Sequence, residues 1–224
     1  MTARPLRRAA ALSSLIALAA CATNRPSRRF EPGNAEQAHD ALAAWDVSLA
    51  RATSLPASRL LYDARVSSGA TPAVPGTLAV TYDGKAVVTA SLTGPFGSRI
   101  AEYRDGTITG EDRSALIVDP QALRAVLTGT WDAPSSPAVE GFDAGQCQFG
   151  LAAEGARVRV VLDLATANPV SLDVTGKGGH LVVDYTGEAS PWPSRLTVRE
   201  ESTKRRLGLK LLAVEPAGTG ETAR

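Results

Sequence analysis

The sequence has few of the residues on which most catalytic and metal centres depend. Only two cysteines and two histidines occur among 224 residues, and His39, His180 and Cys147 do not stand at metal-ligand spacing. No HExxH, CxxC or GxSxG motif is present, and no glycine-rich loop is suited to cradle a phosphate. We therefore expect no enzymatic activity, no metal site and no cofactor. A pairing of His180 with Asp184 and a serine is the enzymatic alternative.

The chain also lacks an excess of positive charge. It has 24 lysines and arginines against 23 aspartates and glutamates, and three of those arginines, Arg4, Arg7 and Arg8, lie in the first 20 residues. Without that segment 21 basic and 23 acidic residues remain, a net charge of −2. Binding to a nucleic-acid backbone needs clustered positive charge. The composition therefore predicts no nucleic-acid partner.

The three arginines precede an apolar run from Ala9 to Ala20 that is shorter than a membrane-spanning helix requires. A cationic start, a short apolar core and small residues at the end are typical of a secretory signal. The run ends in Leu18-Ala19-Ala20-Cys21, which closely resembles the bacterial lipobox. We expect residues 1–20 to be a signal peptide and Cys21 to be the lipid-attachment site. The alternative is an ordinary cleaved signal followed by an accidental cysteine.

A lipid-modified Cys21 would place the protein on a membrane, because several acyl chains together form a stable anchor. Ala22 stands where enterobacterial lipoproteins retained in the inner membrane carry aspartate, so we expect an outer-membrane protein that faces the periplasm. Residues 21–33, with Pro26 and Pro32, are predicted to form a flexible tether. Cys147 would be the only free thiol, and its strand-like surroundings predict a buried apolar role.

A helix is predicted from Asn34, which forms a capping-box pattern with Gln37. Pro56 ends it. Apolar residues recur on one face of this helix, and we expect that face to pack on a sheet. They are Ala38, Ala41, Leu42, Trp45, Leu49 and Ala52.

Most of the remaining chain predicts β-strands, with Asp-Gly turn signals between several of them. A second helix is expected over Gln121–Leu127, beginning at Pro120 and ending at Gly129. Trp131–Gly145 is predicted to be a mobile loop and Glu215–Arg224 a disordered tail. The expected strands are Arg59–Ser67, Thr77–Tyr82, Ala86–Thr93, Ser98–Arg104, Thr107–Glu111, Ser114–Val118, Gln146–Ala152, Arg157–Asp163, Val170–Thr175, Gly179–Tyr185, Arg195–Glu201 and Arg205–Val214.

This pattern predicts one mainly β domain over residues 34–214, with few helices. About 11 strands would form a large curled antiparallel sheet, a half-barrel that encloses an apolar cavity covered by the helices. We expect the cavity or the helix packing to use Leu42, Trp45, Leu49, Leu78, Val80, Leu92 and Ile100.

The loop Gly94-Pro95-Phe96-Gly97 joins two of the expected strands. Proline and glycine suit a tight turn, but they leave Phe96 as an apolar side chain at its tip. One interpretation is that all four residues contact a lipid, a membrane or an acylated partner. The other is that the loop folds back and Phe96 covers its own core.

Two stretches resemble the LolB family of outer-membrane lipoprotein receptors and, more loosely, the LolA/LppX-type half-barrel lipid carriers. One is Leu92-Thr93-Gly94-Pro95-Phe96-Gly97-Ser98, and the other is Pro191-Trp192-Pro193-Ser194-Arg195-Leu196-Thr197-Val198 before the last hairpin. The resemblance implies that acyl chains of a lipoprotein or lipid bind in the half-barrel and that the cargo is then inserted in the outer membrane. Phe96 would take the place of a projecting leucine implicated in that step.

The resemblance further implies a periplasmic LolA-like donor, an acylated cargo and a monomeric receptor. A different class of function remains open from the residues alone: a non-enzymatic envelope scaffold that carries no lipid. The interior separates the two, because a carrier needs apolar residues that face available space and a scaffold needs a filled core.

Overall fold

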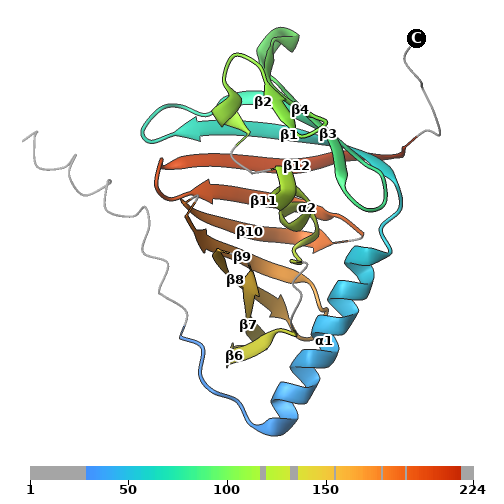
Figure 1. The fold of residues 1–224 in the computed structure, drawn as a ribbon, viewed down its shortest axis with the longest axis vertical. Helices are drawn as coiled ribbons and strands as arrows, with labels where there is room; N and C mark the ends of the chain where they lie inside the picture. Colours follow the sequence, from blue (N-terminus) through green and yellow to red (C-terminus); the bar gives the residue numbers. More distant parts are fainter. Residues whose placement is uncertain are drawn as a thin grey trace, which may run out of the picture.

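One antiparallel sheet of twelve strands organises the chain (Figure 1). The computed structural model describes residues 29–116, 120–131, 136–153, 155–177, 179–189 and 191–217. The strands are β1 (Ser58–Ser68), β2 (Val74–Tyr82), β3 (Val87–Thr93), β4 (Arg99–Arg104), β5 (Thr107–Thr109), β6 (Ala138–Asp143), β7 (Gln146–Ala153), β8 (Ala156–Asp163), β9 (Pro169–Gly176), β10 (Gly179–Ala189), β11 (Pro193–Glu200) and β12 (Arg205–Pro216).

The sheet consists of two meanders, β1 to β5 and β6 to β12. They join where β1 pairs with β12, from Ser58 opposite Pro216 to Ser68 opposite Arg205. The strands β5 and β6 form the two ends of the sheet, which curls without closing in the described residues. Register shifts occur in several pairs, including β1 with β12, and such bulges bend a sheet. The expected half-barrel is confirmed.

The inner face of the sheet, defined here as the face covered by the helices, is apolar. Alternate residues of each strand point to it, as the period of two requires. On β1, for example, Leu60, Tyr62 and Ala64 are fully buried while Arg59 and Arg65 are exposed. The same alternation continues across the sheet and forms a single hydrophobic cluster with both helices.

The helix α1 (Ala35–Thr53) covers the part of the sheet near β6 (Figure 1). Asn34 caps it, and the predicted capping box with Gln37 is present. Trp45 packs on Phe149 of β7 with ring centroids 5.1 Å apart. The buried residues of α1 are Ala41, Ala44, Trp45, Ser48 and Ala52.

The packed face of α1 is rotated from the one we expected. Leu42 is 39 % exposed and Leu49 is half-buried, whereas Ala44 and Ser48 are buried. These small residues let the helix approach the sheet closely, which leaves the two leucines at the flanks. The prediction that Leu42 packs inside is therefore wrong.

The second helix, α2 (Pro120–Thr128), lies over the middle of the inner face, in front of β10 and β11 in Figure 1. It belongs to the long connection between β5 and β6, which leads from one end of the sheet to the other. The strand expected over Ser114–Val118 is wrong in its described part. Residues Arg113–Ala115 form a short 3-10 helix, because the Asp112 side chain caps it through the backbone N–H of Ser114.

The mobile loop expected over Trp131–Gly145 is wrong for its second half, which contains β6. Val139 and Phe142 of this strand pack against the core, and the pairing with β7 supplies its hydrogen bonds. Glu31 exchanges two backbone hydrogen bonds with Phe142, at 3.0 and 2.8 Å. The expected tether is therefore held to the sheet at Glu31. At the other terminus, Glu215 and Pro216 belong to β12 rather than to a tail.

Glu140 ties β6 to its neighbours on the outer face. It accepts hydrogen bonds from Gln148, Arg157 and Arg159 at 2.6, 2.9 and 3.1 Å. Burial alone would raise the pKa of Glu140, but the hydrogen bonds from Arg157 and Gln148 and the charge of Arg159 outweigh it. The pKa is held below its ordinary value of 4.5. The stabilisation is therefore present above that value and is lost as the pH falls through the depressed one.

We expect Glu140→Gln to lower Tm at pH 7 by about 2–4 °C, the shift that about 1 kcal/mol gives in a domain of this size. The difference from wild type should vanish as the pH is taken well below 4.5. Thermal unfolding followed by circular dichroism across that pH range measures it. The exposed Glu111→Gln serves as control, and a Glu140→Gln deficit that persists unchanged in acid would refute the interpretation.

Candidate functional site

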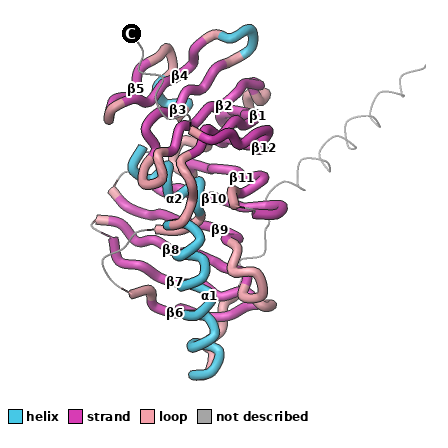
Figure 2. Tube along the Cα trace, turned by 90° about the vertical axis from the view of Figure 1, so that its right-hand side faces the viewer, coloured by secondary structure: helices cyan, strands magenta, loops and turns pink. Residues whose placement is uncertain are grey.

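The β3–β4 connection projects from the end of the molecule opposite α1 (Figure 2). Pro95–Gly97 form a single 3-10 turn, in which the Gly97 N–H donates to the Gly94 oxygen at 3.3 Å. The Gly94 N–H donates to the Ser98 oxygen at 2.7 Å and closes the loop at its base. A side chain at Gly94 would meet Ile100 and Ser98 at 3.0 Å, so the tight closure favours glycine.

Phe96 lies at the tip of this turn and is fully exposed, at 108 % of its reference area. Its φ of 62° and ψ of 20° place it in the left-handed region, which costs a residue with a side chain about 1–2 kcal/mol. The fold-back alternative is thus wrong: Phe96 does not cover the core. A strained backbone that holds a large apolar side chain in water is the feature of this loop that folding does not explain.

The inner face provides the second part of the candidate site. Leu78, Val80 and Leu92 are fully buried on it, and Ile100 packs at its margin. The sequence placed these four residues on the packed side, and the structure puts them there. These residues form an apolar surface that extends toward the Phe96 loop. Leu92 precedes that loop in the sequence and Ile100 follows it.

The helix α2 packs on the inner face and contacts β3 and β11. Val126 and Leu127 are fully buried, and Leu123 is 5 % exposed. The hydroxyl of Tyr185 on β10 donates a hydrogen bond to the Val126 carbonyl at 2.8 Å. Gly129, with φ of 70°, ends the helix against Pro169, which a side chain there would strike at 2.3 Å. The described part of the inner face is therefore filled by the chain's own side chains.

Sequence reasoning missed three aromatic residues of this face. Tyr62, Tyr82 and Trp192 are all buried, and Trp192 packs edge-on against Tyr82 with centroids 5.2 Å apart. The alternation of β1 and β2 was sufficient to place both tyrosines on the inner face. Trp192 lies before β11, outside any periodic pattern, and only the tertiary fold shows its position.

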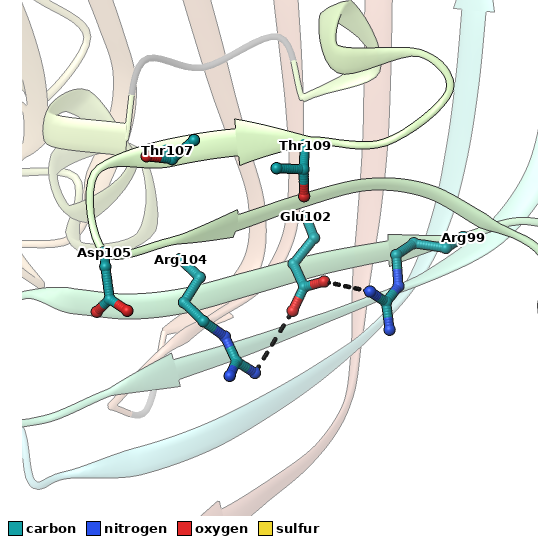
Figure 3. Close-up of a pocket in the computed structure, with 6 residues that line it drawn as sticks. All are labelled: Arg99, Glu102, Arg104, Asp105, Thr107 and Thr109. Carbon is teal, nitrogen blue, oxygen red and sulfur yellow. Dashed lines mark ion pairs between the residues drawn. The ribbon is translucent and has the colours of Figure 1, made fainter.

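The outer face has a polar hollow of about 600 Å³ near the end of the sheet (Figure 3). Glu102 lies between Arg99 and Arg104, with N···O distances of 2.6 and 3.5 Å. The other residues that line the hollow are Asp105, Thr107 and Thr109. The charges on its walls compensate one another and its surface is open, so it suits neither an acyl chain nor a strongly charged ligand.

The residues considered for catalysis are apart from one another. His180 pairs with Asp173 at 3.1 Å rather than with Asp184, which binds Arg199 at 3.0 Å, so the enzymatic alternative built on a His180–Asp184 pair is wrong. In the β9–β10 register His180 lies opposite Thr175, so Asp173, two residues from Thr175 on β9, is its diagonal neighbour on the same face. Cys147 is fully buried, and burial raises its pKa to about 11, as its predicted apolar role requires.

The described residues contain no group of three or more His, Cys, Asp or Glu side chains that could hold a metal ion. None of their helices is long and apolar enough to span a membrane. Cys21, the expected lipid-attachment site, lies outside the described residues, as does the expected signal segment.

No protein-family model matches this chain, and no curated protein sequence matches it. Solved structures do share its fold. The LolA superfamily protein NE2245 from Nitrosomonas europaea aligns with a TM-score of 0.51 and 9 % identity, over 78 % of this chain and 94 % of that one. A putative outer membrane lipoprotein-sorting protein domain from Vibrio parahaemolyticus aligns with a TM-score of 0.50 and 11 % identity, over 84 % and 96 %.

This chain has a LolA/LolB-like fold. The likeness lies in the backbone, since at most 11 % of aligned residues are identical. It confirms the architecture that the two local sequence patterns implied.

Proposed function

We propose that this chain is a bacterial envelope lipoprotein that binds acyl chains of a lipoprotein or lipid on its inner face. Cys21 anchors it in the outer membrane, and the domain faces the periplasm. It accepts its cargo from a LolA-like carrier as a monomer and helps to insert that cargo in the membrane. The protein performs no chemistry; cargo moves along differences in affinity.

The observation that carries this proposal is Phe96, a fully exposed aromatic residue in a left-handed conformation. Burying such a side chain in the membrane or against an acyl chain gives about 1.5–3 kcal/mol, which is comparable to or larger than the backbone strain of about 1–2 kcal/mol. Pro95 and the flanking Gly94 and Gly97 fix the loop so that the ring points outward. The LolA/LolB-like fold and the lipobox support the same assignment.

Cargo binding requires α2 to move away from the inner face. The buried Leu123, Val126 and Leu127 are the contacts that acyl chains would replace. Because the exchange substitutes one apolar contact for another, its net free energy is small and the binding is reversible. The cargo therefore can be released at the membrane.

The scaffold function remains the rival, and the packed inner face is the observation that favours it. Native mass spectrometry of the protein released from envelope membranes separates the two. A carrier retains a lipid adduct, or gains one when an acylated peptide is added. A scaffold stays bare under both conditions, and that result would reject the proposed function.

A further inference from the structure

The inner face holds three polar atoms that its packing does not use. The hydroxyls of Tyr62 and Tyr82 and the ring N–H of Trp192 are buried, and none has a hydrogen-bond partner in the part of the chain that the structure describes. Tyr62 is fully buried, while Tyr82 and Trp192 are each 1 % exposed. Buried polar groups in native proteins nearly always have a partner. Three orphaned groups on one apolar face therefore indicate a partner from outside the chain.

Tyr185 shows which partner this face accepts. Its hydroxyl is buried in the same cluster and donates to the backbone carbonyl of Val126, and more distantly to that of Ala125 at 3.4 Å. Burial raises the pKa of Tyr185, and the nearby Tyr62 raises it further, so both hydroxyls stay protonated donors at neutral pH. The end of α2 thus gives one tyrosine a carbonyl acceptor and leaves the other donors without one.

The chemistry of the three groups limits the chemical class of the ligand. The Trp192 N–H can only donate, so the ligand must offer an acceptor. No lysine or arginine is among the buried residues of the described chain, and Arg124 of α2, whose Nε is buried, is already engaged in an interaction. A buried carboxylate or phosphate would therefore lose its hydration without gaining a cationic partner. A neutral carbonyl oxygen satisfies the donors without that penalty.

We infer that the inner face recognises neutral acyl esters or amides, with Tyr62, Tyr82 and Trp192 donating hydrogen bonds to their carbonyl oxygens. This inference rests on the proposed function and names what the cargo must contain besides hydrocarbon. It selects diacylglyceryl groups over free fatty acids, whose carboxylate is charged. A lipoprotein's modified cysteine and a free diacylglycerol both carry the required group.

The test compares ester and ether probes on the full chain carrying Cys21→Ala, so that no acyl group of its own competes. One probe is a peptide with a dipalmitoylglyceryl-cysteine, and its partner has the same chains in ether linkage. We expect Tyr62→Phe and Tyr82→Phe each to weaken binding of the ester probe roughly fivefold, the value of one neutral hydrogen bond. Binding of the ether probe should not change.

Matched measurements keep the result interpretable. Each Tyr→Phe change removes one oxygen that has no partner among the described residues, so Tm should stay equal or rise. Tyr103→Phe, a half-buried tyrosine of β4, is the control and should alter neither probe. Dipalmitoylglycerol distinguishes the sources: if it binds as tightly as the lipopeptide, any diacylglyceryl lipid is a ligand, and if it does not, the lipoprotein is.

Three outcomes would overturn the inference. Equal losses with ester and ether probes would show that the hydroxyls matter only for packing. No loss with either probe would show that a bound water alone satisfies them. Both results leave the proposed function intact, whereas a wild-type chain that binds none of the probes would reject the proposed function as well.

Discussion

Replacing Phe96 by glutamate is expected to slow delivery of an acylated lipoprotein to membranes by roughly tenfold to hundredfold. That range corresponds to the loss of about 1.5–3 kcal/mol from one buried aromatic side chain. The folded state should be unaffected, because Phe96 contacts water over its whole surface. Transfer of a fluorescent lipoprotein from a soluble carrier to liposomes, with Tm measured in parallel, tests both parts.

A second substitution at the same position separates function from stability. Phe96→Gly removes the same apolar side chain and also relieves the left-handed strain at φ of 62°. Glycine adopts this conformation readily, so Tm should stay the same or rise while delivery falls. Val47→Glu, at a 53 % exposed position on α1, is the control for a surface charge and should deliver normally. Normal delivery by both Phe96 variants would refute the role of the loop.

The second large effect is expected from Leu127, which is fully buried at the end of α2. Leu127→Asp would place a carboxylate against the apolar inner face, at a cost of several kcal/mol. We expect α2 to leave the sheet, a hydrophobic dye to bind the uncovered face, and the affinity for acyl chains to rise at least about tenfold. The affinity rises because binding no longer has to displace the helix.

The milder Leu127→Ala guards against simple misfolding. It is expected to cost about 2–5 kcal/mol when measured as loss of α2 protection in hydrogen exchange. The strands should keep their protection, and lipid affinity should rise in proportion to the loss in α2. If the whole sheet loses protection together with α2, the helix is an integral part of the core. In that case it cannot be the element that cargo displaces.

Much of this architecture follows from local pattern in the sequence. The capping box at Asn34, the Asp-Gly turns and the period of two in the strands are short-range signals, and each has the expected outcome. The sequence also predicted the turn at Phe96, because Pro95 and its flanking glycines favour a turn independently of the tertiary contacts. Its exposure was one of two possibilities until the fold was known.

The errors came where tertiary contacts decide. Strand β6 is rich in acidic and small residues. It forms because it pairs with β7 and because Glu140 makes ion pairs with two arginines. Ala44 rather than Leu42 lies on the packed face of α1, because the orientation of this helix depends on how closely it can approach the sheet. The orphaned tyrosine hydroxyls cannot be read from pattern at all, because an unpaired buried group is a property of the assembled interior.

The central claim, that acyl chains enter the inner face, is tested most directly by quenching of Trp192. A full chain carrying Trp45→Phe and Trp131→Phe leaves this buried residue, 1 % exposed, as the only tryptophan of three. We expect a lipopeptide with brominated acyl chains to quench its fluorescence in a saturable way, and Leu127→Ala to shift saturation to lower concentration. Trp192 fluorescence that stays unchanged, in both the parent and the Leu127→Ala chain, would contradict the account.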